Sequence, residues 1–225
     1  MAFVPAHDAV PRMTMEEYLT QERLAEERHE YLDGYVYAMA GESPDHGRIC
    51  INLVLSLGPQ LRDTPCELFS KDLKVRCGPM TRAGQSQRGL FAYPDVVVVC
   101  GPLQLHDQVR DVVLNPTVLI EVLSPSTEAF DRGEKFRRYQ RWLPTLRDYV
   151  LVAQDRPVVD HYTRPVEAGA AWPMSRSWRY MPYEGLEAVV PLDSIGCTLA
   201  LRDVYARVTL ASSEEEELDN TGERG

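Results

Sequence analysis

The sequence predicts an α/β (α+β) fold, in which helices flank a mixed central sheet and a helix and a β-hairpin lie near the N-terminus. Residues 96–100 and 117–123 form apolar runs typical of strands covered on both faces at the centre of such a sheet. Apolar residues between 49 and 61 recur at helical spacing. Asp33-Gly34 between two aromatic-rich runs is a strong hairpin signal, because a type I′ turn requires positive φ at both central residues.

The first half of the chain carries clear helix signals. Thr14 and Glu17 match a capping box, in which each side chain bonds to the other residue's backbone amide. Ser43-Pro44 is a favourable helix start, with Ser as N-cap and Pro at the first helical position. The elements expected here are a helix over 15–25, strands at 28–32 and 35–40, a helix from 44 to about 62, strands near 66–69 and 72–77, and a basic, mobile loop over 78–92.

The second half alternates strands with one amphipathic helix. The segment 124–127 (Ser-Pro-Ser-Thr) ends a strand and caps the helix that follows. In that helix Asp131 and Lys135 share a face at i, i+4 spacing, beside an apolar stripe. The elements expected here are strands at 96–100 and 117–123, a helix over 127–142, strands near 148–153 and 158–163, a loop over 164–175, strands at 177–183 and 187–190, and a helix over 201–208.

Composition places the 225-residue chain among ordinary globular proteins, with 44% hydrophobic and 26% charged residues. No segment approaches the roughly 18 uninterrupted apolar residues of a membrane span. The N-terminus lacks the basic start and apolar run of a signal peptide, so we expect a cytoplasmic protein. We expect a flexible leader at 1–13, a single domain over 14–210 and a disordered acidic tail at 211–225.

The cysteines are odd in number, widely spaced and without a CxxC pair. Most of them lie in apolar stretches, where a reduced thiol behaves as a small hydrophobic side chain. We therefore expect buried free thiols, with disulfides or a zinc site as the alternative. The five residues are Cys50, Cys66, Cys77, Cys100 and Cys197.

Two acids occupy positions where apolar residues are expected. Asp95 opens one apolar strand and Glu121 lies inside another. A buried carboxylate requires a cation, hydrogen-bond donors or a metal ion. Singly, Asp95 could cap a strand end and Glu121 could pair with an arginine. Two acids on neighbouring central strands favour a shared divalent cation, and oxygen ligands suit Mg²⁺ or Mn²⁺.

Other polar residues are supporting candidates, each with an ordinary structural alternative. Glu30 precedes the hairpin turn and could be an exposed charge there. Lys135 is the candidate cation, although an i, i+4 surface pair with Asp131 is common. His46 lies in the first turn of its helix, where a structural role is the usual one. Ser124 and Ser126 could receive an anion at a helix N-terminus, or could serve only as caps.

The net charge of −10 constrains any role with nucleic acid. A protein that binds nucleic acid by counter-ion release alone should be basic. Such binding would therefore depend on a local basic patch or on bound metal cations. The arginines expected to contact phosphate are Arg82 and Arg88 in the loop and Arg132, Arg137, Arg138 and Arg141 in the helix, with a solvated helix face as the alternative.

Taken in order, these motifs resemble the Uma2 family of the restriction-endonuclease-like PD-(D/E)XK superfamily, over roughly residues 14–208. The matching residues are 28–34 (Arg-His-Glu-Tyr-Leu-Asp-Gly), Met39, His46, 93–95 (Tyr-Pro-Asp), 121–127 (Glu-Val-Leu-Ser-Pro-Ser-Thr), Asp131, Lys135 and Tyr139. The resemblance implies a nuclease-like domain over 14–210, in which Asp95 and Glu121 are the metal-binding acids. Glu30 and His46 match the family's early acid and early His. Leu123 replaces the strand Lys of the wider superfamily, and Lys135 in the following helix matches the Lys of this family.

The resemblance and the residues together predict an endonuclease that uses Mg²⁺ (or Mn²⁺) to hydrolyse phosphodiester bonds in nucleic acid, with DNA expected. Asp95 and Glu121, with Glu30, would bind the metal, and Lys135 would orient or deprotonate water and stabilise negative charge. The superfamily resemblance implies 5′-phosphate and 3′-hydroxyl products. The alternative is a catalytically inactive nuclease-fold protein that binds nucleic acid or another protein, with a homodimer or dependence on a partner left open.

Overall fold

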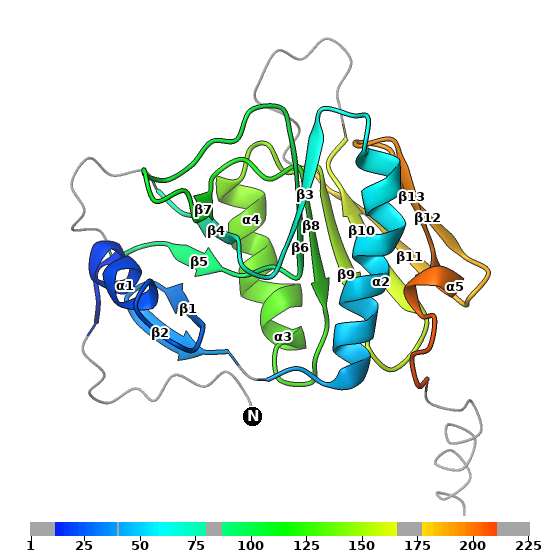
Figure 1. Ribbon diagram of the computed structural model, residues 1–225, viewed down its shortest axis with the longest axis horizontal. Helices are drawn as coiled ribbons and strands as arrows, with labels where there is room; N and C mark the ends of the chain where they lie inside the picture. The colour runs from blue at the N-terminus through cyan, green and yellow to red at the C-terminus, as the bar shows by residue number, and fades with distance from the viewer. Residues whose placement is uncertain (1–11, 40, 80–86, 166–176, 211–225) are drawn as a thin grey trace, which may run out of the picture.

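The computed structural model describes residues 12–39, 41–79, 87–165 and 177–210 (Figure 1). The expected acidic tail, the first eleven residues of the expected leader and most of the expected loop at 164–175 lie outside the described residues. No helix within the described ranges is long and apolar enough to cross a membrane.

The largest sheet has six strands in the order β11-β10-β9-β8-β6-β3. Its central pair, β8 and β9, is parallel, and the other neighbouring strands are antiparallel. This mixed sheet confirms the predicted fold class. The strands are β3 (Cys66–Ser70), β6 (Val96–Cys100), β8 (Val118–Val122), β9 (Asp148–Val152), β10 (Val158–Thr163) and β11 (Arg179–Glu184).

Helices cover both faces of this sheet, as Figure 1 shows. Helix α2 (Pro44–Leu61) packs Leu53 and Leu57 against one face, with Val98 of β6 in the same cluster. The other face carries a continuous helical segment made of α3 (Glu128–Phe130), the π-helical turn η1 (Asp131–Lys135) and α4 (Phe136–Trp142). Val97 and Val99 of β6 point into this second cluster. The apolar run in β6 is continuous because each face meets a different helix.

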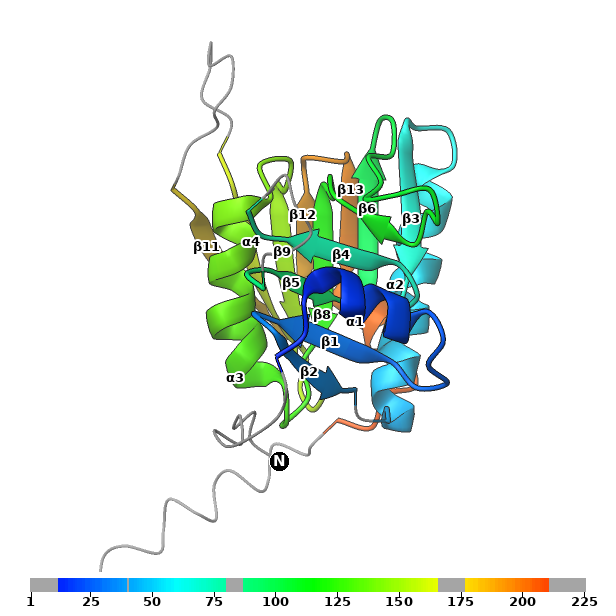
Figure 2. The ribbon, with the colours of Figure 1, turned by 90° about the vertical axis from the view of Figure 1, so that its left-hand side faces the viewer.

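A second, five-stranded sheet has the order β2-β1-β5-β4-β7. Figure 2 shows it in front of the central sheet, with α1 on its outer side. Tyr18 of α1 packs on Tyr31 and Phe91 of this sheet, while Val75 and Leu90 join the core around α4. The elements are α1 (Met15–Glu22), β1 (His29–Leu32), β2 (Tyr35–Ala38), β4 (Lys74–Cys77), β5 (Leu90–Ala92) and β7 (Val112–Val113).

The remaining described elements are a short hairpin and a final helix that pack in the α2 core. Strand β12 (Val189–Leu192) pairs with β13 (Cys197–Ala200), and α5 (Leu201–Val204) follows directly. Buried apolar residues of all three join the cluster that contains Leu53 and Leu57. The α2 face of the central sheet is therefore covered by α2 and this C-terminal segment together.

Most predicted elements are confirmed, with shifts at their ends. The capping box and the hairpin turn form as predicted, with positive φ at both Asp33 and Gly34. The expected loop over 78–92 instead contains β5, and β7 and β13 were not predicted. The helix expected to continue to 208 ends at Val204. The missed strands have two to four residues, too few for a periodic pattern, and depend on pairing with distant segments.

The prediction of free cysteines is wrong for two of the five residues. Cys66 and Cys100 lie directly opposite each other on β3 and β6 and form a disulfide. Cys50, Cys77 and Cys197 are buried free thiols, as predicted. The 34-residue separation gave no sign of the pairing, which depends on the register of two antiparallel strands.

Candidate functional site

Lys135 lies at the centre of a buried group of carboxylates, here called the Lys135 cluster. Its Nζ atom is 2.8 Å from Asp131 Oδ1, 3.2 Å from Glu121 Oε1 and 3.3 Å from Glu30 Oε1. The four side chains are between 3% and 10% exposed. Three carboxylates therefore surround one ammonium group in the protein interior. This arrangement contains more negative than positive charge when all four groups are ionised.

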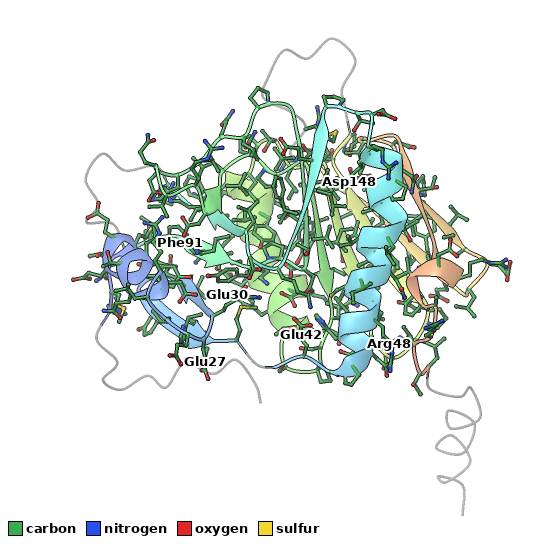
Figure 3. All side chains as sticks on the ribbon, viewed as in Figure 1. Glu27, Glu30, Glu42, Arg48, Phe91 and Asp148 are labelled. Carbon is green, nitrogen blue, oxygen red and sulfur yellow. A yellow bond between two sulfur atoms is a disulfide. The ribbon has the colours of Figure 1, made fainter. Side chains whose placement is uncertain are left out.

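Three separate elements bring these residues together. Glu30 comes from β1 of the small sheet, and Figure 3 shows it between that sheet and α3. Glu121 comes from β8 of the central sheet. Asp131 and Lys135 are the first and last residues of η1. The cluster thus forms where the small sheet, the central sheet and the π-helical turn meet.

Hydrogen bonds hold two of the carboxylates in place. The backbone N–H of Tyr93 donates to Glu30 Oε1 at 3.1 Å. The Tyr139 hydroxyl donates to Glu121 Oε1 at 3.5 Å. Leu123 packs in the apolar core around α4, where the strand Lys of the wider superfamily would lie. Lys135 places an ammonium group beside Glu121 from the helix, and its role in place of the strand Lys stays a prediction.

Burial dominates the electrostatics of this cluster. It raises the pKa of Glu121 well above its usual value; Lys135 acts to lower this pKa, and the neighbouring carboxylates act to raise it. Burial alone would lower the pKa of Lys135, but Asp131, Glu121 and Glu30 raise it well above its usual value. Both pKa shifts arise because a charged group in a low-dielectric interior loses its hydration and depends on neighbouring charges for stabilisation.

Asp95 lies just before β6 and bridges two other elements. Its Oδ2 atom accepts a hydrogen bond from the backbone N–H of Val122 at 2.8 Å. The same oxygen is 3.5 Å from Nε2 of His46 on α2. Burial would raise the pKa of Asp95, but His46 and the Val122 amide lower it below its usual value.

Asp95 therefore lies beside the residue that follows Glu121, and the two carboxylates repel each other electrostatically. The sequence-predicted acids accordingly fall into two adjoining groups, with Glu30 and Glu121 around Lys135 and Asp95 beside His46.

The sequence analysis did not single out Cys50 as a candidate ligand. Its Sγ atom is 3.5 Å from His46 Nδ1, one helical turn away. One ligand atom each from His46, Cys50 and Asp95 lie within 4.8 Å of one another. The sequence did contain a signal for this pair, because His46 and Cys50 are four residues apart and such residues share one face of a helix. The buried apolar surroundings of Cys50 led instead to its interpretation as an inert thiol.

Ser124 and Ser126 bond locally. The Ser124 Oγ atom lies 3.0 Å from both Ser126 Oγ and Thr127 Oγ1. The Ser124 carbonyl accepts from the Glu128 amide as the helical segment begins. Helix α3 has no side-chain cap hydrogen bond at its N-cap, Thr127, so the predicted capping by this segment is not formed. Its binding of an anion stays a prediction.

Two of the arginines predicted to contact phosphate are paired with carboxylates. Arg132 donates from Nε to Glu128 at 2.7 Å and from Nη1 to Asp160 at 2.5 Å. Arg138 donates from Nη1 to Asp33 at 3.0 Å. These pairs use the guanidinium groups within the protein and favour a structural role for both residues.

The other predicted arginines differ in their surroundings. Arg137 is 72% exposed and pairs with Glu134 on its own helix. Arg141 is also exposed and lies over the ring of Trp142. Arg88 has partners within the protein, and Arg82 lies outside the described residues. Arg137 and Arg141 are thus the exposed arginines of α4.

Comparisons with known proteins agree with this picture. A family model described as "Uma2: Putative restriction endonuclease" matches residues 15–201. "Uncharacterized protein slr1290" from Synechocystis sp. (strain ATCC 27184 / PCC 6803 / Kazusa) is 33% identical over 195 residues, which covers 87% of this chain and 92% of that protein. "Uncharacterized protein sll1609" from the same strain is 32% identical over 152 residues, which covers 68% of this chain and 81% of that protein.

A solved structure extends the comparison to the fold. The chain is similar, with a TM-score of 0.64 and 18% identity, to a crystal structure described as "a putative nuclease belonging to DUF820 from Anabaena variabilis ATCC 29413". The match covers 86% of this chain and 97% of that one. At this identity the likeness concerns the fold, and it confirms the restriction-endonuclease-like architecture.

Proposed function

The chain belongs to the Uma2 family, and on that premise we propose that it is an endonuclease that uses Mg²⁺ or Mn²⁺ to hydrolyse phosphodiester bonds, with DNA as the expected substrate. The observation that carries the proposal is the excess of buried carboxylate at the end of β8. Glu30, Glu121 and Asp131 surround one ammonium group, and Asp95 lies beside them. Carboxylates are buried in such numbers when cations compensate them.

The donor set fits a hard divalent cation. Asp95 and Glu121, with Glu30, offer carboxylate oxygens, which Mg²⁺ and Mn²⁺ prefer. Burial raises the pKa of Glu121, and Asp131, Asp95 and Glu30 raise it further although Lys135 lowers it. The ionised form of such a carboxylate would gain from a further cation. When bound, a divalent ion favours ionisation of the attacking water and offsets negative charge on the phosphate.

The residues of the chain would then divide the remaining tasks. Asp95 is fixed in place by the Val122 amide, and Glu30 by the Tyr93 amide, so both carboxylates are preorganised. Lys135 would stabilise the negative charge that develops on the phosphate. Asp131, one helical turn before it, holds the ammonium group at 2.8 Å and acts as a positioning residue. Cleavage would give 5′-phosphate and 3′-hydroxyl ends.

The test is cleavage of single- and double-stranded DNA in Mg²⁺ or Mn²⁺ by wild type, Asp95→Ala and Glu121→Gln. Loss of preorganised electrostatic groups of this kind lowers rates by about 100-fold or more. Asp155→Asn is the matched control, because Asp155 is 65% exposed and pairs only with neighbouring Arg156 among the described residues. Equal activity in Asp95→Ala and wild type would exclude the proposed site.

A second candidate function is that of a catalytically inactive nuclease-fold protein that binds nucleic acid or another protein. It is favoured by Leu123 in place of a strand Lys, by the net charge of −10 and by the carboxylate pairing of Arg132 and Arg138. Calorimetry separates the two candidates without a substrate. Uptake of Mg²⁺ or Mn²⁺ that Asp95→Ala abolishes supports the nuclease, and no uptake by the wild type supports the inactive protein.

A further inference from the structure

Beside the Lys135 cluster lies a group of different chemistry, here called the His46 cluster and made of His46, Cys50 and Asp95. One possible metal-ligand atom from each of the three residues lies within 4.8 Å of the other two. His46 and Cys50 come from consecutive turns of the 18-residue helix α2, and Asp95 lies just before β6. Two well-packed elements therefore fix the three side chains relative to each other.

We propose that the His46 cluster binds a thiophilic divalent ion of the zinc class, and that this ion competes for Asp95 with the hard cation of the proposed nuclease. The competition rests on the proposed function, whereas the binding of the ion does not. Zinc takes thiolate, imidazole and carboxylate ligands together, while Mg²⁺ avoids thiolate. Three protein ligands also leave a fourth tetrahedral position open.

The distances suit one small ion. Tetrahedral zinc with bonds of about 2.0–2.3 Å places its ligand atoms roughly 3.3–3.8 Å apart. His46 Nε2 lies 3.5 Å from Asp95 Oδ2, Cys50 Sγ lies 3.5 Å from His46 Nδ1, and one ligand atom from each residue lies within 4.8 Å of the others. An ion held by Nε2, Oδ2 and Sγ would draw Sγ, which lies beside Nδ1, toward the Nε2 side of the ring.

A further carboxylate orients the imidazole. Glu42, just before α2, has Oε2 at 3.6 Å from His46 Nδ1 and also pairs with Lys71. A metal-binding histidine usually gives its second nitrogen to a carboxylate or carbonyl, which fixes the ring and leaves the other nitrogen to the metal. Glu42 on the Nδ1 side accordingly leaves Nε2, on the Asp95 side, as the ligand atom.

Access and burial are consistent with binding. Side-chain exposure is 11% for His46 and 14% for Asp95, and Cys50 is 3% exposed. The thiol lies at the inner end of the group and the carboxylate at the outer end. An ion that enters past Asp95 would exchange the long His46–Asp95 contact for two metal–ligand bonds.

The two sites cannot use Asp95 at the same time. Asp95 can serve either the hard cation with Glu121 or the thiophilic ion with Cys50. Occupation of the His46 cluster would therefore remove one ligand from the nuclease site. We expect Zn²⁺ to inhibit Mg²⁺-dependent cleavage, with inhibition that weakens as the Mg²⁺ concentration rises.

Cobalt(II) is a direct probe, because a thiolate bound to Co²⁺ gives a charge-transfer band in the near ultraviolet. Co²⁺ titrated into the full-length wild type, without nucleic acid, should produce this band, and an equimolar amount of Zn²⁺ should remove it. Cys50→Ser should abolish the band and weaken Co²⁺ binding by about 100-fold. Cys197→Ser is the matched control, since Cys197 is a buried free thiol of the same core whose Sγ donates to the backbone carbonyl of Ile195.

Absence of the band in wild type, or its persistence in Cys50→Ser, would overturn the proposal. Should Cys50→Ser not fold, Cys50→Ala and His46→Asn provide the same comparison. The inhibition is tested separately. For each protein, the cleavage rate in Mg²⁺ plus Zn²⁺ is divided by the rate of the same protein in Mg²⁺ alone. Inhibition should be strong in wild type and lost in Cys50→Ser. If no protein cleaves DNA, the proposed function fails, while the cobalt result still decides the metal site.

Discussion

Replacement of Lys135 by methionine should be among the most destabilising single changes in this protein. The substitution keeps the length of the side chain but leaves Glu30, Glu121 and Asp131 without their ammonium group. All three carboxylates are at least nine-tenths buried. Removing one partner of a buried ion pair leaves the other as an unpaired buried charge, and its desolvation is then uncompensated.

The magnitude follows from the three contacts. At 2.8–3.3 Å and an effective dielectric constant near 20, each attraction is worth about 5–6 kcal/mol. Desolvation of the ammonium group and repulsion among the carboxylates offset most of this. The expected net loss is about 3–5 kcal/mol, as measured for broken buried ion pairs. That is a large share of the roughly 5–15 kcal/mol by which domains are stable.

Urea unfolding in metal-free buffer, followed by circular dichroism, measures this loss. The loss should be largest at neutral pH and shrink as pH falls, because protonation of Glu121, whose pKa is raised, removes a charge that lacks a partner. Adding Asp131→Asn to Lys135→Met should restore part of the stability. Arg137→Met is the control on the same helical segment, since Arg137 is 72% exposed, and should cost less than about 0.5 kcal/mol. Equal losses in the two single variants would refute the reasoning.

Three further measurements test other parts of the structure. Asp111→Asn removes a carboxylate whose pKa, about 2, is held down by hydrogen bonds from Arg23 and Lys74 despite partial burial. A depressed pKa contributes stability above the unfolded value and loses it as pH falls, so the deficit of the variant, about 1 kcal/mol at pH 7, should vanish in urea titrations near pH 2. Leu53→Ala should lower stability by about 2–5 kcal/mol, because the side chain is fully buried, whereas Leu55→Ala at a 65% exposed position should change it by less than about 0.5 kcal/mol. Alkylation of the unfolded, unreduced protein should modify three cysteines by mass spectrometry, and five modified cysteines would contradict the β3–β6 disulfide.

The sequence predicted those elements whose signals are local. The apolar runs of β6 and β8 indicated strands covered on both faces, and both strands are buried between two helical layers. The first residues of α2 follow from Ser43-Pro44, because capping chemistry depends on neighbours within one turn. The missed strands β5, β7 and β13 have no such local signal. They form because distant segments provide hydrogen-bonding partners.

The candidate site divides in the same way. An acid inside an apolar strand indicated that Glu121 has a special environment, and the family resemblance indicated Lys135. The sequence could not show that Glu30, from a different sheet, and Asp131 would share one ammonium group with Glu121. It also could not show that Asp95 would face α2 and lie beside His46 and Cys50. These contacts depend on how the sheets and helices pack, so they appear only in three dimensions.

The position of Lys135 on a helical segment makes the Lys135 cluster dependent on the hydrophobic core. Lys135 ends a π-helical turn, a feature frequent at functional sites, and its neighbour Phe136 stacks on Tyr149 of β9 at 5.0 Å. Tyr139, in the same helix, is fully buried and also donates to Glu121. A strand Lys would hold its place by the register of the sheet alone. Here the packing of two aromatic rings sets the distance between the ammonium group and Glu121, so a core substitution far from solvent can change the charged site directly.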